Sequence, residues 1–241
     1  MGEVFNGDPA YVGGYQGPVT ALFNYPMYYT IRDVFGSKQS MYGIKNRYNE
    51  EGGHFSDIDA LGLFVDNHDN ARFLNQYNDQ KMFANALVFS LTGRGIPFYY
   101  YGSEQAYAGG NDPQNRESLW QDMNTNSDIY QMTAKVNAAR HATSSYDHPV
   151  DEKYVMDNFY AYARGDMFVA LTNSYDQVQY TVPNLPWADG TTVCNIYYPD
   201  SDCQQINGGS LQVTLTNGEN KIYIPKSNSF FDSNEEVIVQ A

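Results

Sequence analysis

The sequence is poor in basic residues and in long apolar runs. Its 241 residues carry 14 Lys and Arg against 28 Asp and Glu, a formal net charge of -14. Nucleic acids and anionic membranes are bound through clustered Lys and Arg, so this balance argues against both partners. No apolar run approaches the ~20 residues of a membrane-spanning helix. The opening MGEVFNGDPA also lacks the basic and apolar regions of a signal peptide.

Cysteine is also scarce, with only Cys194 and Cys203 present. The two residues flank a short polar segment, as the halves of a disulfide would in an oxidising compartment. Two buried and unpaired thiols are the alternative, and the spacing leaves both open.

Tyrosine and glycine are abundant, with 22 Tyr and 20 Gly. A hydrophobic content of 42% excludes a wholly disordered chain. Tyrosine combines an apolar ring with a hydroxyl, and a Tyr-rich, weakly charged composition is typical of secreted enzymes that act on neutral polar polymers. A merely soluble acidic protein has the same composition, so the motifs must decide.

The pattern of the chain changes near residue 150. Residues 1–149 alternate short apolar runs, typical of buried parallel strands, with helical segments, which indicates an α/β fold. The expected strands are Ala21–Phe23, Leu61–Val65 and Ile96–Tyr100, and the expected helices are Pro26–Phe35, Gln80–Leu91 and one capped by Ser127.

Residues 150–231 read as short alternating strands separated by turn signals. Asn158–Arg164 and Met167–Asn173, joined by Gly165-Asp166, predict a hairpin. The pattern predicts a second domain, an all-β antiparallel sandwich. Residues 232–241 are expected to form a tail without a packing partner.

Three polar clusters stand out. The first is GEVFNGDP, in which Glu3 is either a general acid, favoured by its apolar neighbours, or a solvated glutamate. The second is FVDNHDNARF, in which an apolar strand leads directly into His68 and Asp69. Such a set is costly to bury without a function. The third is AGGNDPQNRE, in which Asp112 and Arg116 form a loop salt bridge or bind sugar hydroxyls.

In this order the clusters resemble the α-amylase family of glycoside hydrolases, particularly the fungal-type secreted α-amylases. The motifs that carry the resemblance are GEVFNGDPAY, NYPMYY, FVDNHDNARF and GIPFYYYGSEQAYAGGNDPQNRESLW, and the likeness extends to about Ile224. It implies about strands five to eight of a (β/α)8 TIM barrel, followed by the β-sandwich domain.

The resemblance also implies roles for individual residues. Glu3 matches the general acid/base, and Asp69 matches the carboxylate that stabilises the oxocarbenium-like transition state. His68 matches an imidazole that hydrogen-bonds the same sugar, and Asp112 and Arg116 match a sugar-binding pair. Gly7 matches a loop lining the side from which product leaves.

One catalytic group of the family has no counterpart here. Retaining glycosidases need a second carboxylate as nucleophile, which in this family lies in a G-[FL]-R-x-D-A stretch that these residues do not contain. The resemblance implies calcium for the complete enzyme, but no calcium or other metal ligands can be assigned in this chain. We therefore expect a truncated form that lacks an N-terminal half, and we expect the isolated chain to be inactive.

The expected function is endo-hydrolysis of α-1,4-glucosidic bonds in starch or glycogen with retention, on an α-glucan or maltooligosaccharide substrate. An α-glucosidase or transglycosylase of the same family is one alternative. A non-catalytic glucan-binding fragment or pseudo-enzyme is the other. Secretion to the extracellular space is expected from the family and composition.

Overall fold

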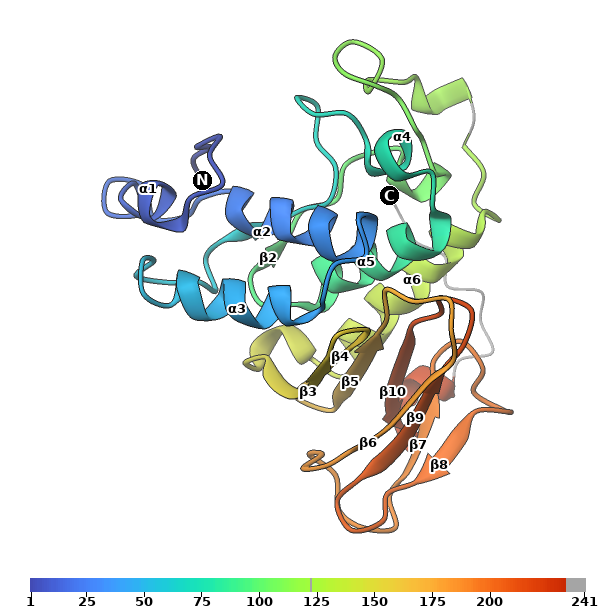
Figure 1. Ribbon diagram of the computed structural model, residues 1–241. Helices are drawn as coiled ribbons and strands as arrows, with labels where there is room; N and C mark the ends of the chain where they lie inside the picture. The colour runs from blue at the N-terminus through green and yellow to red at the C-terminus, as the bar shows by residue number, and fades with distance from the viewer. Residues whose placement is uncertain (122, 233–241) are drawn as a thin grey trace.

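The structure, a computed structural model, describes residues 1–121 and 123–232. Helices gather in the first part of the chain and an antiparallel β-structure forms the second (Figure 1). The α-helices are α1 (Pro9–Gly13), α2 (Tyr25–Ile31), α3 (Tyr42–Glu51), α4 (Phe73–Tyr77), α5 (Gln80–Thr92) and α6 (Asp128–Ala142). A π-helical turn (Arg32–Gly36) continues α2, and four short 3-10 turns are Ser103–Gln105, Leu119–Gln121, Ser145–Asp147 and Ser229–Phe231.

Four extended segments run parallel in the first part. Gly2 pairs with Leu22, and Phe23 pairs with Gly62. Strand β1 (Gly62–Leu63) then pairs with β2 (Ile96–Pro97). The predicted parallel arrangement is therefore confirmed, although the regular strands are shorter than expected.

The prediction that all these runs are buried on both faces was wrong for Ile96–Tyr100. Ile96 is 41% exposed and Phe98 is 36% exposed, whereas Leu63 is 1% exposed. The reason is position: among the described residues β2 pairs only with β1 and so forms an open edge of the parallel segments.

The predicted helix starts are confirmed by their caps. Before α2, the Asn24 side chain accepts a hydrogen bond from the Met27 N–H at 2.9 Å, and Pro26 occupies the first turn. Before α6, the Ser127 hydroxyl accepts one from the Tyr130 N–H at 3.2 Å. Helix α5 begins at Gln80 as predicted and ends at Thr92, one residue beyond the predicted Leu91.

The second part is the predicted antiparallel sandwich. Its larger sheet has the order β3-β4-β5-β10-β7-β8, and β6 pairs with β9 in a second sheet. The strands are β3 (Asp151–Met156), β4 (Phe159–Arg164), β5 (Met167–Leu171), β6 (Val178–Val182), β7 (Thr192–Asn195), β8 (Cys203–Gln205), β9 (Leu211–Leu215) and β10 (Lys221–Pro225). The β4–β5 hairpin turns at Gly165, where φ is 59°. Strands β3 and β8 were not predicted.

A disulfide joins Cys194 on β7 to Cys203 on β8, so the two cysteines are paired and are not free thiols. The two residues face each other in the antiparallel ladder, with their Cα atoms 4.1 Å apart. The bridge closes the segment that carries Tyr197 and Tyr198.

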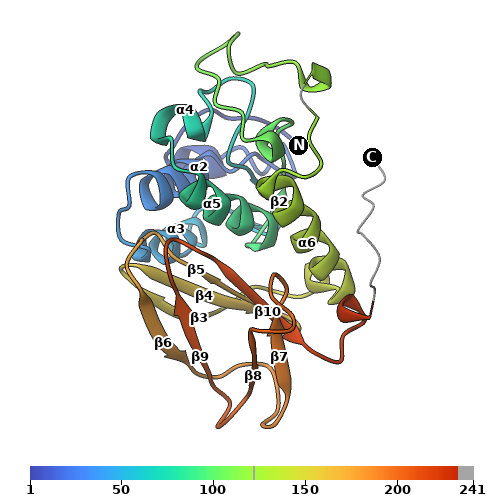
Figure 2. The ribbon, with the colours of Figure 1, turned by 90° about the vertical axis from the view of Figure 1, so that its right-hand side faces the viewer.

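One hydrophobic core connects the helices to the sandwich. One face of the larger sheet packs against α5 and α6 (Figure 2). This shared core includes Phe83, Leu87, Phe89, Val136, Tyr160, Tyr162, Val169, Leu171, Ile222 and Ile224. A second cluster, which includes Phe159, Phe168, Val182, Val213 and Tyr223, fills the sandwich itself. The predicted tail, beyond Asp232, lies outside the described residues.

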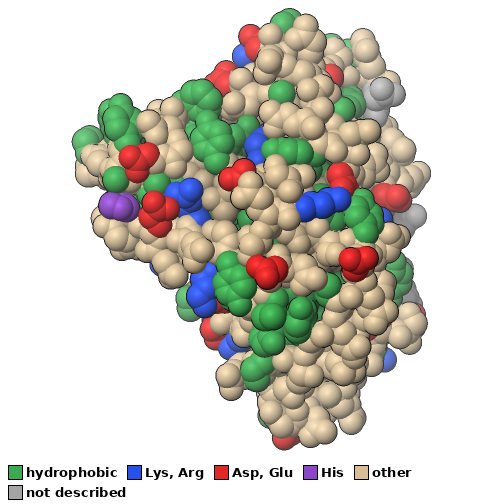
Figure 3. All heavy atoms as spheres, viewed as in Figure 1, with side chains coloured by type: hydrophobic (Ala, Val, Ile, Leu, Met, Phe, Trp, Pro, Cys, Tyr) green, Lys and Arg blue, Asp and Glu red, His purple; other side chains and the backbone are tan. Residues whose placement is uncertain are grey.

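None of the helices that the structure describes combines the length and the apolarity needed to cross a membrane. On the face shown in Figure 3, Lys and Arg side chains lie apart from one another among acidic and neutral groups. This face therefore offers no basic patch for a phosphate backbone.

Candidate active site

The candidate site lies where the parallel segments end. Glu3 follows the bridge at Gly2, Tyr25 follows the bridge at Phe23, and Asn67 and His68 follow β1. Parallel strands place their carboxyl ends at one edge, so these residues from distant parts of the chain meet. Glu3, Asn67 and His68 line a pocket of ≈ 150 Å³, whose other lining residues are Phe23, Phe64, Asp66, Phe98, Tyr99 and Tyr100.

A buried tyrosine hydroxyl connects two of these segments. The Tyr25 hydroxyl donates a hydrogen bond to Glu3 Oε1 at 2.6 Å and accepts one from Asn67 Nδ2 at 2.9 Å. Burial and the bond to Glu3 raise the pKa of Tyr25 well above its usual range. Tyr25 therefore stays protonated at physiological pH and keeps donating to the Glu3 carboxylate.

Asp69 continues the same chain of contacts. Asn67 Oδ1 accepts hydrogen bonds from the backbone N–H groups of Asp69, at 3.3 Å, and Asn70, at 3.0 Å. The Asp69 carboxylate lies 3.4 Å from His68 Nε2 and 3.8 Å from Arg116 Nη2. Asn67 thus contacts Tyr25 with its amide nitrogen and orients the Asp69 backbone with its amide oxygen.

Arg116 brings Asp112 to this cluster, since its Nε lies 2.8 Å from Asp112 Oδ1. The salt bridge considered from the sequence is therefore present. The side chains of His68, Asp69, Asp112 and Arg116 nevertheless remain 45–56% exposed. They form an open polar surface that a ligand can reach.

Asn115 holds the loop that carries Asp112 and Arg116. It is fully buried, and its Nδ2 donates to the carbonyl oxygens of His68 and Asn70, both at 2.9 Å. The two sequence clusters are thereby fastened to each other through backbone atoms.

Arg72 makes the second connection between these loops. It is fully buried, its guanidinium lies 4.5 Å from the Tyr100 ring centroid, and its Nε donates to Glu117 Oε2 at 2.8 Å. Glu117 in turn accepts from the Gly109 N–H at 2.7 Å. The loops that carry the surface charges are therefore joined beneath them by the contacts of Arg72 with Tyr100 and Glu117.

Asp66 has a structural position, although it lies in the same motif as His68. Its carboxylate is buried, accepts hydrogen bonds from the Phe73 N–H at 2.8 Å and Ser103 Oγ at 3.3 Å, and lies 3.6 Å from Arg32. Burial raises the pKa of Asp66 while Arg32 opposes the change. With its oxygens engaged in this way, Asp66 orders the loop.

Gly7 is the candidate residue whose described contacts involve none of the others. It lies against the ring of Tyr29, where a Cβ atom would come within 3.0 Å. No described contact connects it to Glu3 or Asp69. The close approach explains why glycine suits this position, independently of any substrate.

Sequence reasoning missed Tyr25, Asn67, Arg72, Asn115 and Glu117. Tyr25 and Asn67 had a usable signal, since each follows a predicted strand at the edge where Glu3 and Asp69 were sought. The other three residues act through partners on distant loops, which spacing along the chain does not reveal.

The described residues do not fit the calcium that the resemblance implies. Among residues 1–121 and 123–232, no group of three or more His, Cys, Asp or Glu side chains could hold a metal ion. The buried carboxylate nearest the site, Asp66, is already occupied by hydrogen bonds and Arg32. We therefore assign no catalytic step to a metal.

Comparison with known proteins identifies the family of the chain. The sequence model of the family described as alpha amylase, catalytic domain, matches residues 1–180. The chain belongs to this α-amylase family of glycoside hydrolases, which confirms the resemblance stated from the motifs.

Two relatives and one solved structure show how far the likeness extends. The chain is 36% identical to an alpha-amylase of Saccharomycopsis fibuligera, covering 93% of this chain and 47% of that protein. It is 42% identical to the beta/alpha-amylase of Paenibacillus polymyxa, covering 92% of this chain and 19% of that protein. The structure of an alpha-amylase from Malbranchea cinnamomea matches with a TM-score of 0.86 and 34% identity. The match covers 92% of this chain and 49% of that one. The chain thus spans about half the length of two of these proteins and about a fifth of the third.

Proposed function

We propose that the chain forms the second half of a (β/α)8 barrel and its β-sandwich, within a retaining α-amylase that cleaves internal α-1,4 bonds of starch or glycogen. The open edge at β2 and the single partner of Gly2 among the described residues support an incomplete barrel. The observation that carries the functional proposal is the connection of Glu3 to the Asp69 loop through Tyr25 and Asn67.

Glu3 acts as general acid/base in this proposal. Cleavage requires a proton on the departing glycosidic oxygen, and a carboxylic acid beside the bond supplies it. The hydroxyl of Tyr25 fixes Glu3 Oε1, which leaves Oε2 to face the substrate.

Asp69 stabilises the transition state, which is positively charged at the anomeric carbon. Its half-exposed carboxylate can accept hydrogen bonds from sugar hydroxyls without a large desolvation cost. His68 donates to the same sugar ring, while Asp112 and Arg116 bind a neighbouring one. Gly7 belongs to a loop that lines the side from which product leaves.

The nucleophile comes from sequence outside these residues. A retaining mechanism needs a second carboxyl roughly 5–5.5 Å from the acid, and the chain contains no R-x-D-A stretch to supply it. Asp69 does not replace it, because its carboxylate is already near His68 and Arg116 on the sugar-gripping side. The isolated chain should bind maltooligosaccharides without hydrolysing them.

The protein is proposed to act outside the cell. The Cys194–Cys203 disulfide supports an oxidising compartment.

Complementation tests the proposal. Maltoheptaose is incubated with the chain alone, and then with the chain plus the part of the Saccharomycopsis fibuligera alpha-amylase that this chain does not match. We expect no hydrolysis by the chain alone. The mixture should release products that first appear as the α-anomer, observed by NMR.

Glu3→Gln in the reconstituted mixture should lower kcat by about 10²–10⁴-fold, the usual contribution of a general acid. Glu50→Gln is the matched control, since Glu50 lies on the exposed end of α3, and should leave kcat unchanged. Full retaining activity of the chain alone, or an active Glu3→Gln mixture, would contradict the proposal.

A further inference from the structure

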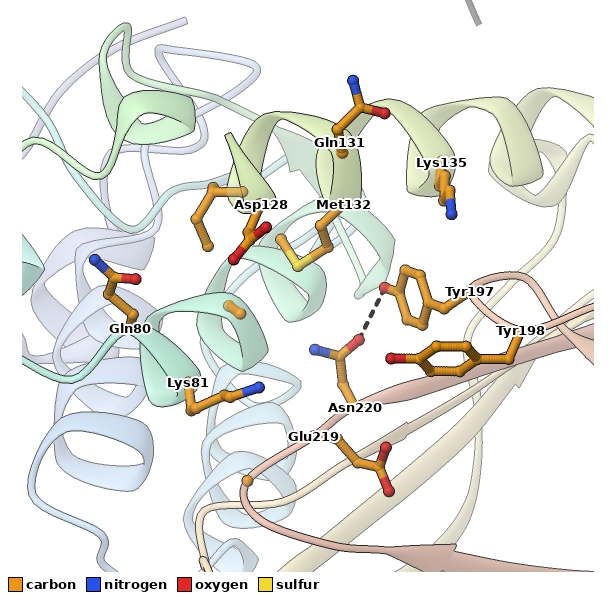
Figure 4. Close-up of a pocket in the computed structure, with 13 residues that line it drawn as sticks. Gln80, Lys81, Asp128, Gln131, Met132, Lys135, Tyr197, Tyr198, Glu219 and Asn220 are labelled. Carbon is orange, nitrogen blue, oxygen red and sulfur yellow. Dashed lines mark hydrogen bonds between the residues drawn. The ribbon is translucent and has the colours of Figure 1, made fainter. Parts of the chain in front are cut away.

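A second pocket lies between the helices and the sandwich, away from the candidate active site (Figure 4). Its volume is ≈ 440 Å³ and it shares no lining residue with the pocket at Glu3. The starts of α5 and α6, the β7–β8 connection and the β9–β10 turn form its walls. This volume falls in the range of small-ligand sites, which is about 300–1,000 Å³.

One wall carries two consecutive tyrosines, Tyr197 and Tyr198. The Tyr197 hydroxyl donates to Asn220 Oδ1 at 2.8 Å, which fixes its ring, and the neighbouring Tyr198 is 56% exposed. Figure 4 shows both side chains directed from the β7–β8 connection into the pocket, with Met132 of α6 across from them. An exposed tyrosine ring offers an apolar face to C–H groups and a hydroxyl to polar ones.

The opposite walls carry polar side chains without partners. Gln80, Lys81, Asp128 and Lys135 line the pocket, and their side chains make no hydrogen bond or ion pair with any other described residue. Glu219 adds a second carboxylate, so the lining holds two lysines and two acids and carries no formal net charge. Balanced charge disfavours an anion or a cation and suits a neutral ligand with many hydroxyl groups.

We propose that this pocket is a second saccharide-binding site, which holds a short α-glucan against Tyr198. The choice of an α-glucan rests on the proposed function, whereas the preference for a neutral polyhydroxyl ligand rests on the pocket itself. The site anchors substrate on the helix–sandwich boundary while another part of the same polymer occupies the site at Glu3.

NMR of the methionine methyl groups tests the proposal, because Met132 lines the pocket. Maltotriose at millimolar concentration should shift the Met132 methyl resonance. Tyr198→Ala should weaken this response by about tenfold or more, as expected for loss of a central aromatic contact. Tyr42→Ala, which removes a 38%-exposed tyrosine on α3, is the matched control and should bind as the unmodified chain does.

Asp69→Asn separates the two sites, since it should leave the Met132 response intact. A Met132 resonance unmoved by maltotriose, an equal response in Tyr198→Ala, or a response to inorganic phosphate instead of sugar would overturn the inference. If Met132 stays silent while calorimetry detects maltotriose binding that Asp69→Asn abolishes, the second site fails and the proposed function stands. If Met132 responds while the complementation mixture is inactive, the second site stands and the proposed function fails.

Discussion

At the scale of single residues, Tyr25 explains how an exposed acid and a distant loop are kept together. Its ring is fully buried against Phe64, while its hydroxyl reaches both Glu3 and Asn67. A phenylalanine would fill the same space but would leave the carboxylate and the amide without their shared partner.

Glu51 provides a test of buried charge in this fold. It is fully buried at the end of α3, and neither carboxylate oxygen has a hydrogen-bond partner among the described residues. Burial raises the pKa of Glu51 from its usual 4.5 to about 7, although nearby Asn24 and Arg47 favour the charged form.

The folded state therefore holds a proton on Glu51 that the unfolded chain releases above pH 4.5. We expect the free energy of unfolding to fall as pH rises from 4.5 to about 7, by on the order of 3 kcal/mol from this group. Glu51→Gln should remove this decrease, measured by urea unfolding at pH 5 and pH 8. Glu50→Gln, at the exposed neighbour, should keep it, and an identical pH dependence in Glu51→Gln would refute the account.

At the scale of elements, the loops of the site are bonded to one another. Asn115 and Arg72 fasten residues 108–117 to residues 66–73 by the bonds described above. The sequence identified both loops but not this mutual support, because two of the bonds end on backbone oxygens and the third joins residues 45 positions apart.

Asn115→Ala should release the loop that carries Asp112 and Arg116. Loss of two buried hydrogen bonds should cost about 1–3 kcal/mol, and hydrogen exchange should quicken in residues 108–117 and 67–70. The control Asn111→Ala alters an exposed residue of the same loop. Unchanged exchange in Asn115→Ala would show that the loops stand independently.

Helices with clear signals were predicted and α3 was not. Helices α5 and α6 have capping side chains and a regular apolar stripe, whereas α3 has no side-chain cap and buries only Ile44 and Glu51 completely. Helix α3 is held by its contacts with α2 and by Lys45, whose Nζ lies 2.7 Å from Glu152 on β3. Such tertiary support is invisible in a local pattern.

At the scale of the whole molecule, the predicted division near residue 150 crosses a shared core. Asn85 of α5 is fully buried and bonds to both the Gly218 carbonyl oxygen, at 2.8 Å, and the Thr172 N–H, at 3.1 Å. Composition and periodicity revealed the change from helices to strands. They could not reveal that the sheet needs α5 to cover one of its faces.

We therefore expect the two parts to unfold together. In a Trp120→Phe background, fluorescence of buried Trp187 reports the sandwich, and circular dichroism at 222 nm reports mainly the helices. The two urea transitions should have the same midpoint. Separate midpoints would mean that the parts are independent folding units.

The central claim is that Glu3 and Asp69 act on one sugar ring. A crystal structure of the chain with maltoheptaose measures this directly. The account predicts one glucose ring within hydrogen-bond distance of both carboxylates. A glucan bound with Glu3 and Asp69 contacting different rings, or with either carboxylate left out of contact, would contradict it.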